Sequence, residues 1–304
     1  MSAVTSDDTR ILPLGDDVVA TLLRRRAASP DKGAILYVHG FADYFFQEHV
    51  ADHYTAQGYD FYAIDLRGYG RSLRPGVPPN YTTDMAVYYD ELDQAVQAIR
   101  TEDGHSRLVV VGHSTGGLIT SLWAHERRDA GVVDALVLNS PWLDVVEPPP
   151  VRKLVKFLGR RFPHLKIRGG LGDVYGRSIH SDHHGEWAFD LTMKPLDGFP
   201  VLAGWIRAIL LAQEKVQGGL DVRVPVLLLH SDRSLLTMKK WSQEAMTADL
   251  VIEVEHMRKW GPKIGSDVTL VEIPGGLHDL FLSPEPVRTR ALTEVDSFLA
   301  RQFA

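Results

Sequence analysis

The segment from Val109 to Gly117 constrains the fold and the chemistry of this chain more than any other. Three valines lead into Gly112, Ser114 and Gly116, and a helical pattern starts at Leu118. Glycines on both sides of the serine allow a strand and a helix to approach closely around a sharp turn. The helix N-terminus offers free N–H groups beside the hydroxyl, where they would stabilise an oxyanion. The pattern therefore predicts Ser114 as a nucleophile, with a glycine-rich connecting loop as the alternative.

Composition narrows the class of protein and its possible partners. The chain has 304 residues, of which 44% are hydrophobic and 24% charged, as in an ordinary globular protein with a large core. The absence of cysteine excludes disulfides and thiolate chemistry. A net charge of −6 argues against nucleic acid as a partner. The first residues lack the pattern of a signal peptide, and no apolar run is long enough to span a bilayer, so we expect a cytoplasmic protein.

Apolar, β-branched runs alternate with helical patterns along most of the chain. This alternation is typical of a parallel sheet covered by helices on both faces. An antiparallel hairpin is predicted around Gly15, from strands 10–14 and 18–24. The other predicted strands are 33–38, 59–64, 107–111, 135–138, 224–229 and 268–273, and the predicted helices are 45–57, 83–100, 118–128 and 286–303.

One interval, residues 145–222, interrupts this alternation. It shows no strand pattern, but it contains three consecutive prolines, a basic amphipathic stretch and a helical pattern over 201–215. Such an interval is too long for a simple loop in a compact domain. We therefore predict a core of residues 1–144 and 223–304 and a helical insertion of residues 145–222.

A nucleophilic serine needs a base and an acid, and the ends of the last two predicted strands supply candidates. His278 lies in the loop after strand 268–273, at the sheet edge where catalytic groups gather, although it could also be an exposed loop histidine. Asp232 follows strand 224–229, and Asp249 opens a helical pattern over 250–260. Either aspartate could reach the imidazole. His113 is expected to point away from the hydroxyl and to pack or orient the turn.

The donors of an oxyanion hole are expected from two loops. The N–H of Phe41 follows the first long strand of the core, and the N–H of Thr115 follows the nucleophile. Both are backbone roles, so the side-chain types of these residues carry little information.

Four motifs in order resemble the α/β-hydrolase superfamily over nearly the whole chain. They are His39–Asp43, Asp65–Ser72, Gly112–Gly117 and Gly275–Asp279. Within the superfamily the chain is most similar to the monoacylglycerol lipase and lysophospholipase branch, also labelled serine aminopeptidase-like. The resemblance implies a mostly parallel eight-stranded sheet flanked by helices, with a helical cap inserted after the sixth strand.

The resemblance also implies which aspartate is the acid. In this branch an Ala-Asp pair precedes the histidine by about thirty residues, and Ala248-Asp249 lies 29 residues before His278, whereas Asp232 lies 46 before it. This favours Asp249. The stretch from Asp232 to Thr247 departs from the family pattern, because it looks like an insertion, and it keeps Asp232 as a rival.

The implied function is a serine ester hydrolase acting on acylglycerol, lysophospholipid or similar lipid-like esters, with Ser114, His278 and Asp249 as a triad and no cofactor. The histidine-rich segment 180–186 matches no metal-ligand spacing, so no metal is expected. A peptidase or acyltransferase on the same residues is one alternative, and a catalytically silent ligand-binding protein is another. A small-molecule ester is the expected partner, and no protein partner is implied.

The segment 151–170 carries seven basic side chains and no acidic one. Its apolar residues, predicted to share one helical face, are Val151, Leu154, Val155, Leu158 and Phe162, and its basic residues are Arg152, Lys153, Lys156, Arg160, Arg161, Lys166 and Arg168. One interpretation is that the apolar face packs over the active site while the charges are solvated. The other is that the segment contacts anionic membrane lipids.

Overall fold

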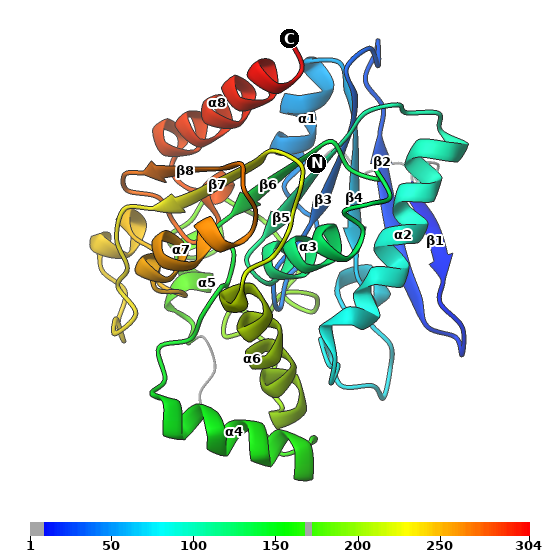
Figure 1. Ribbon diagram of the computed structural model, residues 1–304. Helices are drawn as coiled ribbons and strands as arrows, with labels where there is room; N and C mark the ends of the chain where they lie inside the picture. The colour runs from blue at the N-terminus through cyan, green and yellow to red at the C-terminus, as the bar shows by residue number, and fades with distance from the viewer. Residues whose placement is uncertain (1–8, 168–171) are drawn as a thin grey trace.

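The computed structural model describes residues 9–167 and 172–304, which form an eight-stranded sheet with helices on both faces (Figure 1). The strand order is β1-β2-β4-β3-β5-β6-β7-β8, and only the pairings of β2 with β1 and β4 are antiparallel. All eight strands were predicted to within two residues. Their bounds are β1 Thr9–Pro13, β2 Val19–Arg25, β3 Gly33–Val38, β4 Tyr59–Asp65, β5 Leu108–His113, β6 Ala135–Asn139, β7 Val226–Ser231 and β8 Val268–Ile273.

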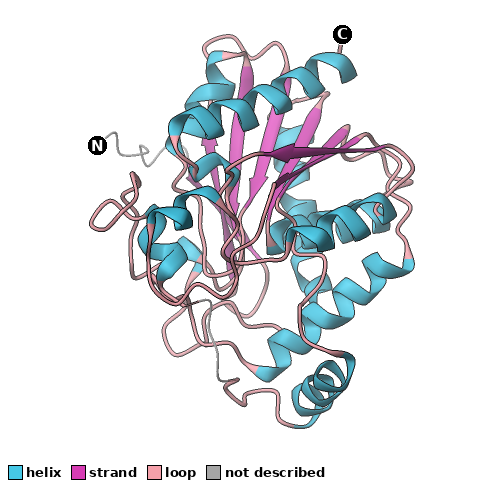
Figure 2. Ribbon diagram, turned by 90° about the vertical axis from the view of Figure 1, so that its left-hand side faces the viewer, coloured by secondary structure: helices cyan, strands magenta, loops and turns pink. Residues whose placement is uncertain are grey.

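The central strands are apolar on both faces because each face packs against helices (Figure 2). Neighbouring residues of β5 enter different layers: Val110 belongs to one core cluster, and Val109 and Val111 belong to the other. Helices α2 (Tyr89–Gln97), α3 (Thr115–Glu126) and α7 (Val254–Trp260) cover the first face, and helices α1 (Glu48–Ala56) and α8 (Glu285–Gln302) cover the second.

Two predicted helices begin later than their apolar patterns suggest. Helix α1 starts at Glu48, because the preceding residues form a loop in which the N–H of Phe45 donates to the Asp65 carboxylate. Helix α7 starts at Val254 rather than at residue 250, because residues 250–253 turn around the Asp249 carboxylate. In both places a buried carboxylate accepts from backbone N–H groups ahead of the helix and holds the chain there in a turn or loop.

The predicted helix 83–100 is divided into three parts. A 3₁₀ turn over Met85–Tyr88 leads into α2, and a π-helical turn over Ala98–Glu102 ends the segment.

In the described part of the interval between β6 and β7, where a helical insertion is predicted, the structure has three helices. They are α4 (Pro149–Arg161), α5 (Val174–Ile179) and α6 (Ala203–Gly218). Figure 1 shows α4 and α6 beyond one end of the sheet. The two helices meet at Gly159, where a Cβ atom would lie 2.3 Å from the carbonyl oxygen of Ala203.

Helix α4 does not bury the apolar face predicted for it. Val151 and Val155 line a cavity beneath the helix, but Leu154 and Phe162 are 56% and 51% exposed, and the neighbouring Phe157 is 61% exposed. The prediction that the whole face packs over the site is therefore wrong. The two helices can approach closely only where α4 presents Gly159 to α6. The side of α4 that carries Leu154 and Phe157 is therefore exposed.

The basic residues of α4 also divide into two groups. Arg152 pairs with Asp144, and Lys156 pairs with Glu214. Lys153 and Arg160 form no ion pair with any residue that the structure describes, and Arg168 lies outside the described residues. Within residues 9–167 and 172–304, no helix is long and apolar enough to cross a bilayer.

Candidate active site

Ser114 lies at the junction of β5 and α3 in a strained backbone conformation. Its φ of 53° and ψ of −116° are unusual for a residue with a side chain and cost about 1–3 kcal/mol. The contacts around it explain the flanking glycines. A Cβ at Gly112 would lie 2.4 Å from Thr120 Oγ1, and one at Gly116 would lie 2.3 Å from the His39 carbonyl oxygen. Close packing of α3 against β5 and the loop after β3 therefore holds the strained turn in place.

The structure brings the three predicted side chains together in a hydrogen-bonded chain. His278 Nε2 lies 2.9 Å from Ser114 Oγ, and His278 Nδ1 lies 2.8 Å from Asp249 Oδ2. All three residues are buried. With its proton on Nδ1, the imidazole donates to the carboxylate and can accept the serine proton at Nε2.

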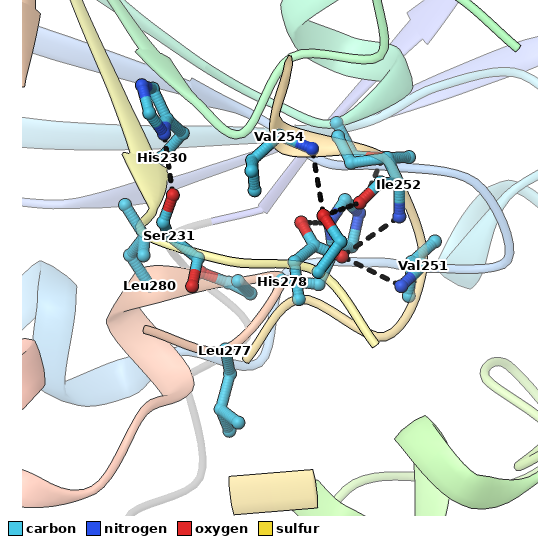
Figure 3. A network of polar contacts seen from close by, with 12 residues as sticks. His230, Ser231, Val251, Ile252, Val254, Leu277, His278 and Leu280 are labelled. Carbon is cyan, nitrogen blue, oxygen red and sulfur yellow. Dashed lines mark hydrogen bonds and ion pairs between the residues drawn. The ribbon is translucent and has the colours of Figure 1, made fainter. Parts of the chain in front are cut away.

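Asp249 is held by backbone donors as well as by the imidazole. Its Oδ1 accepts hydrogen bonds from the N–H groups of Val251 (2.7 Å) and Ile252 (2.9 Å). Figure 3 shows these two residues beside His278, with dashed lines from their N–H groups. One carboxylate oxygen is thus fixed by the chain, and the other faces the histidine. The sequence predicts a helical pattern from residue 250, so it does not reveal this turn.

The rival acid, Asp232, lies elsewhere. Its carboxylate accepts a hydrogen bond from the N–H of Gly275 at 2.8 Å, at the start of the loop that carries His278. The residue is partly exposed. Asp232 therefore holds the base of the histidine loop and makes no contact with the imidazole.

Phe41 and Thr115, the two predicted oxyanion donors, both line the cavity that contains Ser114. Neither backbone N–H donates to another described residue. Both groups are therefore available to an oxyanion. The Phe41 ring contacts Trp205 of α6, with centroids 4.2 Å apart, which ties this loop to the insertion.

His113 is buried and lines the same cavity as Ser114. Its Nδ1 donates to the carbonyl oxygen of Asn139 at 3.1 Å, and its ring centroid lies 4.9 Å from that of His278. Burial lowers the pKa of His113, and the neighbouring His278 lowers it further. The ring is therefore uncharged and does not repel an imidazolium formed on His278.

A buried polar network that the sequence did not reveal positions the histidine loop. Asp279 accepts hydrogen bonds from Asn139 Nδ2 (2.7 Å) and Gln47 Nε2 (3.1 Å), and its own N–H donates to the Tyr175 hydroxyl. Asn139 also accepts from the N–H of Leu280. The only signal in the sequence was an acidic residue directly after His278, and spacing cannot identify partners so distant in the chain.

A cavity of about 460 Å³ is lined by Ser114 and His278 and extends into the insertion. Most of its lining is apolar and comes from α4, α6 and the loops beside them, including Trp142, Val145, Val151, Val155, Trp205, Ile206 and Leu210. Among the charged residues of its wall, Asp43 and Lys194 pair with each other at 2.7 Å, and Arg152 and Glu147 also line it. A mostly apolar cavity with few polar groups is typical of a site for a lipid-like molecule.

The histidine-rich segment 180–186 forms a loop at the edge of the insertion. His180 Nδ1 accepts from the N–H of Asp182, and the His180 ring packs against Phe189. No group of three or more potential ligands in the described part of the chain is arranged to hold a metal ion.

Comparisons with known proteins agree with this architecture. The family model described as serine aminopeptidase, S33 matches residues 29–285. A monoacylglycerol lipase of Mycolicibacterium smegmatis is 26% identical over 84% of both chains, and lysophospholipase L2 of Escherichia coli is 23% identical over 94% of this chain and 85% of its own. The structure of a soluble variant of monoglyceride lipase from Saccharomyces cerevisiae superimposes with a TM-score of 0.72 at 18% identity, covering 97% of this chain and 96% of that one. The expected resemblance to this branch of α/β-hydrolases is confirmed.

The close contact at the nucleophile turn gives a testable prediction. We expect Gly116→Ala to lower the free energy of unfolding by about 1–3 kcal/mol, because its Cβ would collide with backbone oxygens that cannot move away. Gly218→Ala is the matched control: it is also in a helix, and its Cβ would meet nothing within 4 Å. Urea denaturation measures both, and equal stabilities of the two variants would contradict the packing argument.

Proposed function

The chain belongs to the serine aminopeptidase, S33 family and is a hydrolytic enzyme of the esterase and lipase type, and we propose that it cleaves lipid-like carboxylic esters through an acyl-enzyme on Ser114. The observation that carries the proposal is the chain of hydrogen bonds from Ser114 Oγ through His278 to Asp249 beneath an apolar cavity.

In the proposed mechanism His278 Nε2 accepts the proton of Ser114 as Oγ attacks the ester carbonyl. The N–H groups of Phe41 and Thr115 hold the oxyanion, and the Asp249 carboxylate stabilises the imidazolium. The imidazolium then donates its proton to the leaving alcohol. Water repeats the sequence on the acyl-enzyme and regenerates the serine. None of these steps needs a metal or an organic cofactor.

The cavity supports a substrate with a long acyl group. Its apolar wall runs from Trp142 beside the nucleophile to Val151 and Val155 of α4. Burying each methylene of an acyl chain there would contribute about 0.8 kcal/mol. The relatives named monoacylglycerol lipase and lysophospholipase support the same class of substrate. A peptidase or acyltransferase would use the same three residues, so comparing amide, ester and acyl-acceptor substrates separates these functions.

The outer side of α4 supports contact with a lipid surface. Leu154 and Phe157 are exposed there, and Lys153 and Arg160 lie beside them without ion pairs to described residues. Exposed apolar side chains flanked by basic ones favour the interface of an anionic bilayer. Because Val151 and Val155 of the same helix line the cavity, a lipid bound at this surface would be separated from the cavity only by the width of α4.

The nucleophile and base can be tested together. Ser114→Ala and His278→Ala should each lower kcat for a p-nitrophenyl ester by about 10⁴-fold or more, because the members of a triad act as a unit. A fluorophosphonate probe should label the wild type but not Ser114→Ala. Circular dichroism checks that both variants fold, and substantial turnover or labelling in a folded Ser114→Ala variant would refute the assignment.

The acid is tested by two matched substitutions. Asp249→Asn should lower kcat by about 10⁴-fold, because the amide favours the wrong imidazole tautomer and cannot stabilise imidazolium. Asp232→Asn should have a much smaller effect, since the Asp232 carboxylate accepts from the backbone N–H of Gly275 in the histidine loop, whereas the imidazole bonds to Asp249. Steady-state kinetics on one soluble ester compares the two, and the opposite ranking would transfer the role to Asp232.

Membrane contact is tested with charge reversal on α4. Lys153→Glu with Arg160→Glu should weaken binding to vesicles containing anionic lipid by more than about tenfold, since each basic residue near such a surface contributes about 1 kcal/mol. Lys32→Glu with Arg290→Glu is the control: it makes the same change of charge at two exposed positions of the core, outside the insertion. Both double variants should cleave a soluble short-chain ester normally. Equal binding of the two to vesicles would contradict a role for α4.

A further inference from the structure

A buried ion pair in the wall of the cavity has no part in the proposed mechanism. Lys194 Nζ of the insertion lies 2.7 Å from Asp43 Oδ1 in the loop after β3, and the two residues are 8% and 2% exposed. Both line the same cavity as Ser114 and His278. The pair is therefore positioned to contact whatever occupies the site.

The pair lies on the oxyanion side of the nucleophile. A Cβ at Gly40 would lie 3.1 Å from Ser114 Cβ, and the N–H of Gly40 lies 3.5 Å from Asp43 Oδ2. Phe41 and Ala42, which connect these two residues, also line the cavity. The long apolar wall formed by α4 and α6 suits an acyl chain, which leaves the side of Asp43 and Lys194 for the alcohol part of the ester.

Stability alone does not account for this pair. Desolvating two charges costs about as much as their attraction returns, so apolar side chains would often be as stable there. Lys194 has three N–H donors, and Asp43 is the one described acceptor hydrogen-bonded to it. The rings of Phe46 and Phe189 lie 5.6 Å and 5.8 Å from its ammonium. The N–H groups of Lys194 that do not donate to Asp43 are therefore available to a hydroxyl group in the cavity.

Asp43 stays charged despite its burial. Burial raises the pKa of its carboxyl, but the charge and hydrogen bond of the Lys194 ammonium oppose this effect, and the pKa lies below its usual range. The pair therefore presents a carboxylate acceptor and an ammonium donor side by side. This arrangement suits neighbouring hydroxyl groups, each of which can donate and accept.

The charges around the cavity disfavour an anionic headgroup. Among the described residues of the lining, Lys194 pairs with Asp43 and Arg152 pairs with Asp144, while Glu147 adds a further negative charge. A phosphate placed here would be desolvated without an unpaired cation from any of these residues, which is costly.

We propose that Asp43 and Lys194 bind the hydroxyl groups of the leaving alcohol and so select esters of an uncharged polyol such as glycerol over alkyl esters and phosphate-bearing esters. The inference rests on the proposed ester hydrolysis at Ser114 and assigns the alcohol specificity of that site.

The first test compares three esters of one fatty acid: monodecanoylglycerol, ethyl decanoate and decanoyl lysophosphatidic acid, whose headgroup is an anionic phosphate. We expect the wild type to show its highest kcat/KM with the glycerol ester. In Lys194→Met with Asp43→Asn, which removes both charges and leaves neither unpaired, the preference for the glycerol ester over the ethyl ester should fall about tenfold, the value of one or two hydrogen bonds. Lys215→Met changes an exposed lysine outside the cavity and should keep the wild-type ratio.

A second test uses the wild type alone and so does not depend on how the double variant folds. In the acyl-enzyme, an added alcohol can replace water: its oxygen forms the new ester bond, the bond to Ser114 Oγ breaks, and the alcohol proton passes through His278 to Oγ. With a p-nitrophenyl ester as acyl donor, glycerol should be acylated several-fold more efficiently than 1-propanol or glycerol 3-phosphate at equal concentration.

The outcomes separate the inference from the proposed function. If the double variant lowers kcat/KM for the glycerol and ethyl esters by the same factor, the pair only fastens the insertion to the core, and the inference is overturned while ester hydrolysis stands. Faster cleavage of the lysophospholipid, or equal acylation of glycerol and 1-propanol, would also overturn it. If no ester is cleaved and Ser114 is not labelled by a fluorophosphonate, the proposed function itself fails.

Discussion

The close approach of α3 to the strands beneath it is the constraint on which the site depends. Ser114 keeps a strained backbone only because the helix packs against β5 and the loop after β3 at distances that leave no room for a Cβ at Gly112 or Gly116. Packing that holds the serine also brings the N–H groups of Phe41 and Thr115 to the same cavity. The fold thus supplies the energy that this local conformation costs.

The histidine loop is fixed by a different kind of interaction. Here the charge of Asp279 is buried, but donors from Asn139, Gln47 and the chain surround it, so that its desolvation is compensated. Asp249 is held in the same way by the N–H groups of Val251 and Ile252. Two buried carboxylates, Asp279 held by groups distant in the chain and Asp249 held by the turn that follows it, thereby set the position of the His278 imidazole between Asp249 and Ser114.

The insertion forms much of the wall of the cavity that contains Ser114 and His278. Helix α4 contributes to the cavity through Val151 and Val155 and leaves Leu154 and Phe157 exposed. The contact with α6 at Gly159 decides this orientation, because only a residue without a side chain allows the two helices to approach so closely. The same insertion brings Lys194 to Asp43, so this ion pair in the cavity wall joins one residue of the insertion to one residue of the core.

The sequence by itself determined the eight strands, the helical insertion and the residues that meet at the site. The alternation of strand patterns with helical patterns reveals a parallel sheet covered by helices. The glycines on both sides of Ser114 reveal a sharp turn between a strand and a helix. Tertiary structure alone decided which side of α4 is exposed and which charges pair. The residues by themselves left both Asp232 and Asp249 as candidates, and the family resemblance favoured Asp249; in the structure the turn over residues 250–253 holds Asp249 against the imidazole, whereas Asp232 bonds to Gly275. The pairs Asp43–Lys194 and Asn139–Asp279 join residues more than a hundred positions apart, and such contacts depend on how whole elements pack, which no local pattern encodes.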